Sequence, residues 1–231
     1  MSERVVDVVD DPAAVVARRL REVVTAGGHV ALSGGSTPRR AYELAAAAGG
    51  DWTLGTLWYG DERCVPPDDE RSNHRMVVEA LLDRLPEPAR PAVHRIEGER
   101  GAQAAAADYE ARIAGELGAR PVLDLVLLGL GSDGHTASLF PGKPEVEERE
   151  RPVVAVPEAG LEPFVPRVTL TLPVFDAARE VIFLMAGAGK AEAVARAFGP
   201  AADRSRPAAR VTPTGGVLRL VLDPAAAAGL G

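Results

Sequence analysis

The sequence predicts an α/β fold in which a mostly parallel sheet is covered by helices on both faces. Short apolar segments typical of buried strands alternate along the chain with segments whose apolar residues recur at helical spacing. The most apolar run, residues 122–130, suits the centre of such a sheet. Polar, glycine-rich clusters directly follow several of the strand-like segments, where α/β sheets bind their ligands.

The elements follow from local signals read in order along the chain. A strand is expected over residues 4–9, and Asp11 then caps a helix that has Pro12 in its first turn and stops at Gly27. Further strands are expected over residues 29–32, 54–59, 123–128, 153–156, 168–172, 181–185 and 217–222. Further helices are expected from Pro38, from near Ser72, over residues 101–117 and after Lys190.

The chain is interpreted as a single domain over residues 1–231, because it contains no internal repeat and no long linker. The alanine-rich tail from Ala225 is expected to fray.

Composition narrows the classes of function. The net charge is −7 and no basic face is recognisable, so nucleic acid and anionic membranes are not expected as partners. Cys64 is the single cysteine, which excludes an intrachain disulfide and suits a reducing compartment. The N-terminal segment has no signal-peptide pattern, and no apolar run approaches the roughly 18 residues of a membrane span. We expect a cytoplasmic protein that is a monomer or a homodimer.

A first chemical cluster spans residues 33–38, Ser-Gly-Gly-Ser-Thr-Pro, between an expected strand and an expected helix. Gly34 and Gly35 let backbone N–H groups approach a ligand, and Ser36 and Thr37 add hydroxyl donors. The helix N-terminus carries unpaired donors and a partial positive charge, so this turn is expected to bind phosphate. An ordinary capped turn is the alternative interpretation.

A second cluster, residues 129–135, contains G-x-G-x-x-G after the strongest strand. A dinucleotide site is disfavoured because Pro141 and Pro144 follow too soon for a normal helix. The turn is better suited to presenting Asp133 and His135 at the strand end. A histidine titrates near neutral pH and can take a proton from water, and a nearby carboxylate can orient it.

Three more cationic positions are candidates for anion binding. Asp61 and Arg63 follow an expected strand, and an arginine fork can hold phosphate or carboxylate. Arg167 begins another strand. Lys190 closes a strand-to-helix turn that fails the P-loop pattern, and it is one of only two lysines in the chain. No paired histidine spacing indicates a metal site, and neither a metal nor a cofactor is expected.

Four segments together resemble one known family, the 6-phosphogluconolactonases, in order and spacing over about residues 10–222. They read SGGSTPRRAYELAA, WYGDERCVPPDDERSNHRMVVEALL, LDLVLLGLGSDGHTASLFPG and RVTLTLPVFDAAREVIFLMAGAGKAEAV. The resemblance implies a three-layer αβα sandwich with a modified Rossmann-like sheet. It also implies hydrolysis of 6-phospho-D-glucono-1,5-lactone, a phosphosugar lactone, in the oxidative pentose phosphate pathway.

The resemblance implies roles for the matching residues. His135 is expected to be the general base that activates water, with Asp133 orienting it. Gly34, Gly35, Ser36, Thr37 and Lys190 would cradle the phosphate, and Arg63 and Arg167 would hold the phosphate or the polar end of the substrate. Asp61 matches a position that transfers protons in isomerase relatives. Arg63 or backbone N–H groups are the candidates for stabilising the oxyanion.

Two other functions fit the sequence less well. In the related glucosamine-6-phosphate deaminases the D-G-H turn continues to a glutamate that assists ring opening, whereas Phe140 occupies that position here. An aromatic ring cannot transfer protons, so the lactonase is favoured. A non-enzymatic phosphosugar sensor would normally carry a helix-turn-helix segment, and the expected strand at residues 4–9 leaves no room for one.

Overall fold

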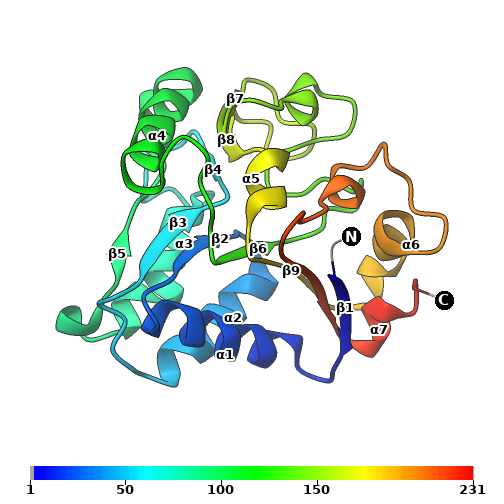
Figure 1. Ribbon diagram of the computed structural model, residues 1–231, viewed down its shortest axis with the longest axis horizontal. Helices are drawn as coiled ribbons and strands as arrows, with labels where there is room; N and C mark the ends of the chain where they lie inside the picture. Colours follow the sequence, from blue (N-terminus) through cyan, green and yellow to red (C-terminus); the bar gives the residue numbers. More distant parts are fainter. Residues whose placement is uncertain (1–2, 231) are drawn as a thin grey trace.

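The larger of two sheets has seven strands that all run parallel, and the computed structural model describes it within residues 3–230 (Figure 1). In spatial order the strands are β1 (Glu3–Val8), β10 (Val217–Leu222), β9 (Glu180–Met185), β6 (Leu125–Leu128), β2 (His29–Leu32), β3 (Thr56–Tyr59) and β5 (Ala92–Val93). The apolar run predicted to be central is β6, which lies fourth of the seven. Every residue of β6 is buried, as a strand covered on both faces requires.

The order of the strands reverses between β2 and β6. From β2 the chain moves to β3 and β5 on one side, and then returns through β6 to β9 and β10 on the other. Parallel α/β sheets bind ligands in the crevice outside such a reversal, at the carboxyl ends of the strands. A ligand site is therefore expected at the turns that follow β2 and β6.

A second, antiparallel sheet has three strands, β4 (Asp61–Arg63), β8 (Arg167–Leu170) and β7 (Val153–Val156). Two of these strands were predicted from their apolar residues, but their separation from the main sheet was not. β4 was expected to be a polar loop. Its short charged sequence carries no apolar alternation, so only its pairing with β8 makes it a strand.

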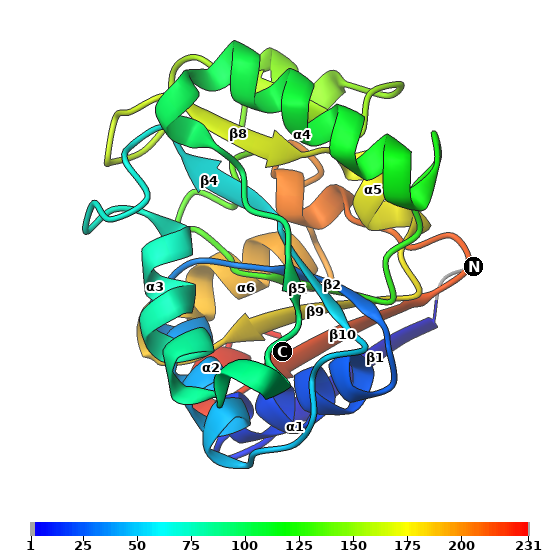
Figure 2. The ribbon, with the colours of Figure 1, turned by 90° about the vertical axis from the view of Figure 1, so that its left-hand side faces the viewer.

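The helices complete a three-layer arrangement, which confirms the predicted fold class. Helices α1 (Pro12–Thr25) and α2 (Ser36–Ala47) pack together on one side of the main sheet, and the small sheet lies on the other side with α4 (Ala102–Leu117) over it (Figure 2). The remaining helices are α3 (Asn73–Ala80), α5 (Leu172–Ala177), α6 (Ala191–Phe198) and α7 (Pro224–Ala227). Within residues 3–230, no helix is both long enough and apolar enough to cross a bilayer.

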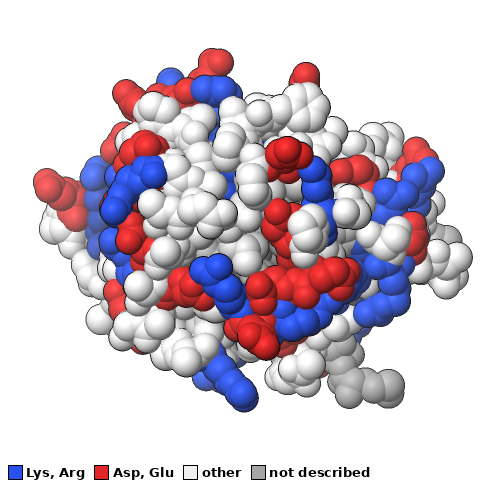
Figure 3. All heavy atoms as spheres, turned by 90° about the horizontal axis from the view of Figure 1, so that it is seen from above, with Lys and Arg blue, Asp and Glu red and all other residues white. Residues whose placement is uncertain are grey.

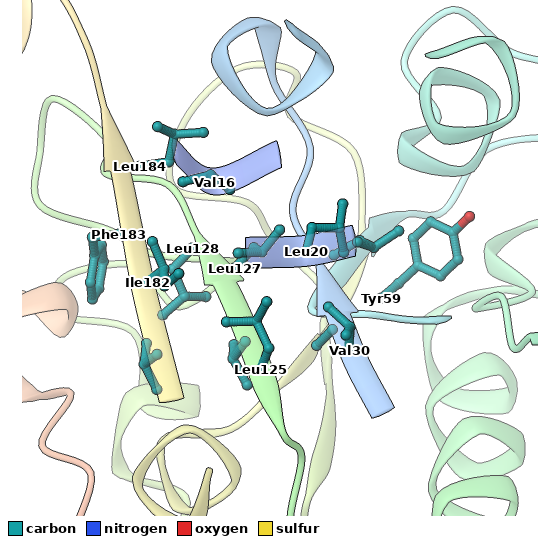
Figure 4. Packing of buried hydrophobic residues seen from close by; sticks show 14 of the residues in the cluster. Val16, Leu20, Val30, Tyr59, Leu125, Leu127, Leu128, Ile182, Phe183 and Leu184 are labelled. Atoms are coloured by element: carbon teal, nitrogen blue, oxygen red, sulfur yellow. The ribbon is translucent and has the colours of Figure 1, made fainter. Parts of the chain in front are cut away.

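The core forms between α1 and the central strands. Val16 and Leu20, one turn apart on α1, are fully buried with Leu127 of β6 and Leu184 of β9 in one cluster (Figure 4). Their spacing puts both on one face of the helix, as the sequence predicted. Burying a side chain of this size stabilises the fold by roughly 1.5–3 kcal/mol.

Two further local predictions were wrong. Helix α2 begins at Ser36, two residues before Pro38, because Gly35 at a φ of 110° takes the N-cap position. Ser36 and Thr37 therefore belong to the first turn of the helix. The tail does not fray throughout, because Asp223 accepts a hydrogen bond from the Ala226 backbone N–H and caps α7. The last residue of that tail, Gly231, lies outside the described residues.

Candidate active site

A pocket of about 340 Å³ opens at the carboxyl ends of β2, β6 and β9, on the strand-order reversal. It brings together the glycine turn after β2, the charged strand β4, the turn after β6 and the turn after β9. The predicted residues that line it are Gly34, Gly35, Ser36, Thr37, Asp61, Arg63, His135, Arg167 and Lys190. Asp133 is the one predicted site residue outside this lining, because it lies behind His135.

The N-terminus of α2 points its first turn into this pocket. The turn before it is fixed by Tyr42, whose buried hydroxyl accepts from the Ser33 N–H at 2.9 Å and donates to the Ser33 carbonyl at 2.8 Å. Arg39 and Arg40 turn away from the pocket, toward Glu79 and Asp11. The N–H groups and hydroxyls of the first turn, rather than these two arginines, are therefore the donors that the helix offers to an anion.

His135 and Asp133 form a hydrogen-bonded pair. Nδ1 of His135 lies 2.6 Å from Oδ1 of Asp133, which also accepts from the His135 backbone N–H at 3.0 Å. Burial by itself would raise the pKa of Asp133, but these hydrogen bonds outweigh burial and lower that pKa. The ionised carboxylate holds the proton on Nδ1, so Nε2 is the lone-pair nitrogen of the neutral ring.

Two neighbours shape the turn that carries this pair. A Cβ atom at Gly131 would lie 2.0 Å from Nδ1 of His135, so only glycine lets the ring fold back over the turn. Arg206 donates from Nη1 to the Asp133 carbonyl at 2.7 Å and packs its aliphatic stem against Gly134. Arg206 could not be predicted from the sequence, because its loop is about seventy residues away and carries no recognisable motif.

Phe140 forms an apolar wall beside the imidazole. Its ring centroid lies 4.8 Å from that of His135, and the Arg167 guanidinium lies 5.2 Å from the Phe140 centroid. Phe140 is buried, so no water is available at its ring. The Phe140 ring thus contacts both the imidazole and the guanidinium and supplies no proton-transfer group.

Arg63 and Arg167 face each other on neighbouring strands of the small sheet, because they are directly paired in register between β4 and β8. Arg63 Nη1 donates to the Arg71 carbonyl at 2.8 Å, and Arg167 Nη2 donates to two carbonyls of residues 161–163. The Nε of each arginine is buried and has no hydrogen-bond partner within residues 3–230. Burial lowers the pKa of Arg167, and the nearby Arg63 charge lowers it further, against the opposing influence of Asp61. Two like charges held this close favour an anion between them.

Lys190 lies at the end of a short 3-10 turn (Ala188–Lys190), and its side chain lines the pocket. Its ammonium donates to the Leu130 carbonyl at 2.6 Å, in the turn after β6. This bond places a compact positive charge between the turns that follow β9 and β6.

Asp61 is buried at the start of β4, where two uncharged groups hold its carboxylate. Ser138 Oγ donates to Oδ2 at 2.6 Å, and Asn73 Nδ2 lies 3.3 Å from Oδ1. Asn73 and Ser138 were not singled out from the sequence. Asn73 follows Ser72, near which a helix was expected to begin, but no local pattern shows that the Asn73 side chain turns into the pocket.

Larger hollows lie elsewhere, away from the strand-order reversal. One of about 530 Å³ lies at the amino ends of the strands, where Arg19 and Arg219 both bind Glu180 and Arg179 binds Asp124. Its charges neutralise one another. In the part of the chain that the structure describes, no group of three or more His, Cys, Asp or Glu side chains is arranged to hold a metal ion.

Comparison with known proteins agrees with this geometry. The family model described as glucosamine-6-phosphate isomerases/6-phosphogluconolactonase matches residues 3–220. A 6-phosphogluconolactonase from Nostoc sp. is 38% identical over 99% of this chain and 99% of its own length. The human 6-phosphogluconolactonase is 42% identical over 85% of this chain and 78% of its own. The chain belongs to the glucosamine-6-phosphate isomerase/6-phosphogluconolactonase family.

Solved structures of this family superpose on the whole chain. The 6-phosphogluconolactonase from Trypanosoma brucei has a TM-score of 0.86 and 29% identity, with all of both chains covered. A monomeric glucosamine-6-phosphate deaminase has a TM-score of 0.79 at 18% identity, over 97% of this chain and 98% of its own. The latter likeness concerns the fold alone, so the two activities of the family must be told apart by the side chains in the pocket.

Proposed function

We propose that this family member is a 6-phosphogluconolactonase, which hydrolyses 6-phospho-D-glucono-1,5-lactone to 6-phospho-D-gluconate in the oxidative pentose phosphate pathway. The observation that carries the proposal is the Asp133–His135 pair in the same pocket as the two facing arginines. One group can activate water, and the others can hold an anion at a distance from it. The relatives named above, at 38% and 42% identity, carry this activity in their names.

His135 acts as the general base. With its Nδ1 proton held by Asp133, Nε2 takes a proton from a water molecule as the oxygen attacks the lactone carbonyl. The tetrahedral intermediate then collapses, the bond from the carbonyl carbon to the ring oxygen breaks, and the imidazolium returns the proton to that oxygen. A lactone is already an activated ester, so a positioned base, worth about 10²–10⁴-fold in rate, needs no covalent intermediate.

The phosphate is held by the donors on the other elements. The first turn of α2 and Lys190 form its cradle, and Arg63 and Arg167 hold it or the adjacent polar end of the substrate. Binding the phosphate fixes the distant carbonyl against His135, which replaces a bimolecular encounter by a positioned one. Asp61 is an acceptor beside this path, and we assign it to the sugar rather than to the phosphate.

Phe140 distinguishes the lactonase from the deaminase. Ring opening of an amino sugar phosphate needs a group that moves protons at this point, and the Phe140 ring moves none. Its buried ring instead packs against the imidazole of His135 and gives that ring an apolar neighbour.

One assay tests the proposal. Freshly prepared 6-phosphogluconolactone is added, and the formation of 6-phosphogluconate is followed by a coupled dehydrogenase against a blank without enzyme. We expect ring opening well above the blank, and no ammonia release from glucosamine 6-phosphate. Rapid ammonia release, or ring opening at the blank rate, contradicts the proposal. A cytoplasmic location, and a monomer or homodimer, are proposed with it and are tested by cell fractionation and sedimentation.

A further inference from the structure

The side chain of Asn73 offers the pocket an amide oxygen that has no partner within residues 3–230. This side chain is 2% exposed, lines the pocket, and lies at the start of α3. Its Nδ2 donates to the Asp61 carbonyl at 2.9 Å and approaches Oδ1 of Asp61 at 3.3 Å. No hydrogen bond to its Oδ1 is made by any residue in the range 3–230.

The orientation of this amide is forced by chemistry. A backbone carbonyl oxygen only accepts hydrogen bonds, so the NH₂ end of Asn73 must face Asp61. Turning the amide over would bring two acceptor oxygens to hydrogen-bond distance. Its Oδ1 therefore points the other way, against Gly34, where a Cβ atom would lie 2.0 Å from it.

This acceptor selects among the groups of a phosphosugar lactone. The phosphate oxygens, the carbonyl oxygen and the ring oxygen are acceptors, and they gain nothing from another acceptor. The hydroxyl groups are the donors of the substrate. The Asn73 Oδ1 atom is open to the pocket rather than fully buried. A ligand that fills the pocket removes water from this oxygen, and an acceptor then left unpaired costs free energy, so a ligand that supplies a donor there is favoured over one that does not.

We propose that Asn73 Oδ1 accepts a hydrogen bond from one hydroxyl group of the bound sugar acid, which makes Asn73 a specificity-determining residue. This inference rests on the proposed function. Asp61 holds the amide in the orientation that reads the hydroxyl, while the first turn of α2 on the other side of Gly34 holds the phosphate. The same loop thus separates recognition of the anion from recognition of the sugar.

The test measures whether Asn73 and one hydroxyl act on each other. Calorimetric titration is carried out with 6-phosphogluconate, with analogues in which one hydroxyl is replaced by hydrogen, and with inorganic phosphate. In the unmutated protein, one analogue should bind about tenfold more weakly than 6-phosphogluconate, because the site rejects a ligand that leaves its acceptor unpaired. The ratio of these two dissociation constants is the affinity gap. In Asn73→Ala the gap should shrink to about threefold or less, while the affinity for inorganic phosphate stays the same.

Ser138→Ala is the matched control. It removes a hydrogen bond to the other oxygen of Asp61 and leaves the Asn73 acceptor in place. If Asn73 only positions Asp61, both variants will narrow the gap equally, and the inference is wrong. We expect Ser138→Ala to keep the gap.

The outcome is decided even if Asn73→Ala does not fold. If no analogue binds the unmutated protein more than threefold more weakly than 6-phosphogluconate, no hydroxyl is read and the inference fails. Failure of the proposed function looks different, because the unmutated protein would then neither bind 6-phosphogluconate nor open the lactone. If the unmutated protein hydrolyses the lactone but no analogue shows the affinity gap, the inference about Asn73 is rejected and the proposed function stands.

Discussion

The imidazole of His135 has Nδ1 bound to Asp133 and Nε2 without a partner in the described chain. Mutation can therefore test the proposed base, His135, separately from Asp133, which orients it. We predict that His135→Ala lowers kcat by about 10²–10⁴-fold, because the general base is lost. The affinity for inorganic phosphate should not change, since the donors that hold an anion lie on other elements. Stopped-flow lactone hydrolysis and phosphate titration measure the two quantities. If the variant keeps most of its turnover, another group must act as the base, and Asp61 is the first alternative.

Gly34 separates the anion cradle from Asn73, and it tolerates no side chain. In Gly34→Ala the new Cβ would lie 2.0 Å from Asn73 Oδ1, and that amide cannot retreat because Asp61 holds its other end. We predict a KM raised at least about tenfold and a loss of about 1–3 kcal/mol in the free energy of unfolding, as expected for overpacking. Enzyme kinetics and urea denaturation measure both effects.

Gly189→Ala is the control for this change. A Cβ at Gly189 would have nothing within 4 Å, although the residue directly precedes Lys190. Its kinetics and stability should stay near those of the unmutated protein. Equal damage in both variants would mean that glycine flexibility, rather than the close approach of Asn73, matters at position 34.

The residues that could be predicted from the sequence share one property. His135, Asp133 and the residues of the glycine turn lie directly after apolar strands, so their neighbourhood is visible in a short stretch of chain. Asn73 and Arg206 reach the site across the fold, from a helix start and from a loop. Their role depends on tertiary contacts, and neither residue type is unusual where it stands.

At the level of elements, α3 is anchored by a carboxylate from another part of the chain. Glu62 of β4 is 3% exposed and accepts from the backbone N–H groups of Asn73 and His74, from Arg63 N–H and from the Ser72 hydroxyl. Burial raises the pKa of Glu62, and the backbone hydrogen bonds counteract part of that rise. The N-terminus of α3 thus has its unpaired donors satisfied by a side chain that no capping motif announces.

We predict that Glu62→Gln destabilises the protein by about 1–3 kcal/mol although it preserves size. An amide has only one acceptor oxygen, so its NH₂ group would face N–H donors and leave them unpaired. Glu79→Gln on the same helix is the control. Glu79 is exposed and pairs with Arg39 and Arg75, and such surface pairs contribute about 0–1 kcal/mol each. Chemical denaturation compares the two, and equal losses would contradict the role of Glu62 in holding α3.

The order of the strands could be inferred only in part. Apolar runs and helical spacing located helices α1, α2, α3, α4 and α6 and every strand of the main sheet except β5 within a few residues, because each is decided by local pattern. The two-residue strand β5 and the short helices α5 and α7 were not predicted. The pairing of β4 with β8 joins residues about a hundred positions apart, and the three charged residues of β4 carry no strand signal. That pairing places Arg63 opposite Arg167, so the least predictable contact of the fold brings together the two arginines of the proposed anion site.

At the scale of the whole molecule, the net charge of −7 and the binding of an anion are compatible because positive groups are concentrated where four segments meet. On the face shown in Figure 3, positive and negative side chains are interspersed and no extended basic surface appears. The pocket collects Arg63, Arg167, Lys190 and the N-terminus of α2 from segments spread over more than 150 positions. A ligand that contacts all of them holds the tertiary fold together.

Ligand binding should therefore raise the melting temperature. At a concentration of 6-phosphogluconate one hundred times its Kd, the native state gains about 2.7 kcal/mol. For a chain of this size that corresponds to a rise of roughly 5–10 °C in Tm. Lys190→Ala should show a smaller rise at the same concentration, because the ammonium that bridges the turns after β9 and β6 is lost.

The chain offers a matched control, since Lys143 is its only other lysine. Lys143 pairs with the exposed Glu158 outside the pocket, so Lys143→Ala should keep the full rise in Tm. Gluconate without a phosphate group should raise Tm much less than 6-phosphogluconate in the unmutated protein, because the facing arginines and the cradle then have no dianion to bind. Differential scanning fluorimetry over a ligand series measures all four cases. An equal rise in the two lysine variants would remove Lys190 from the anion site, and an equal rise with gluconate would show that the four segments are held together by the sugar instead of by its phosphate.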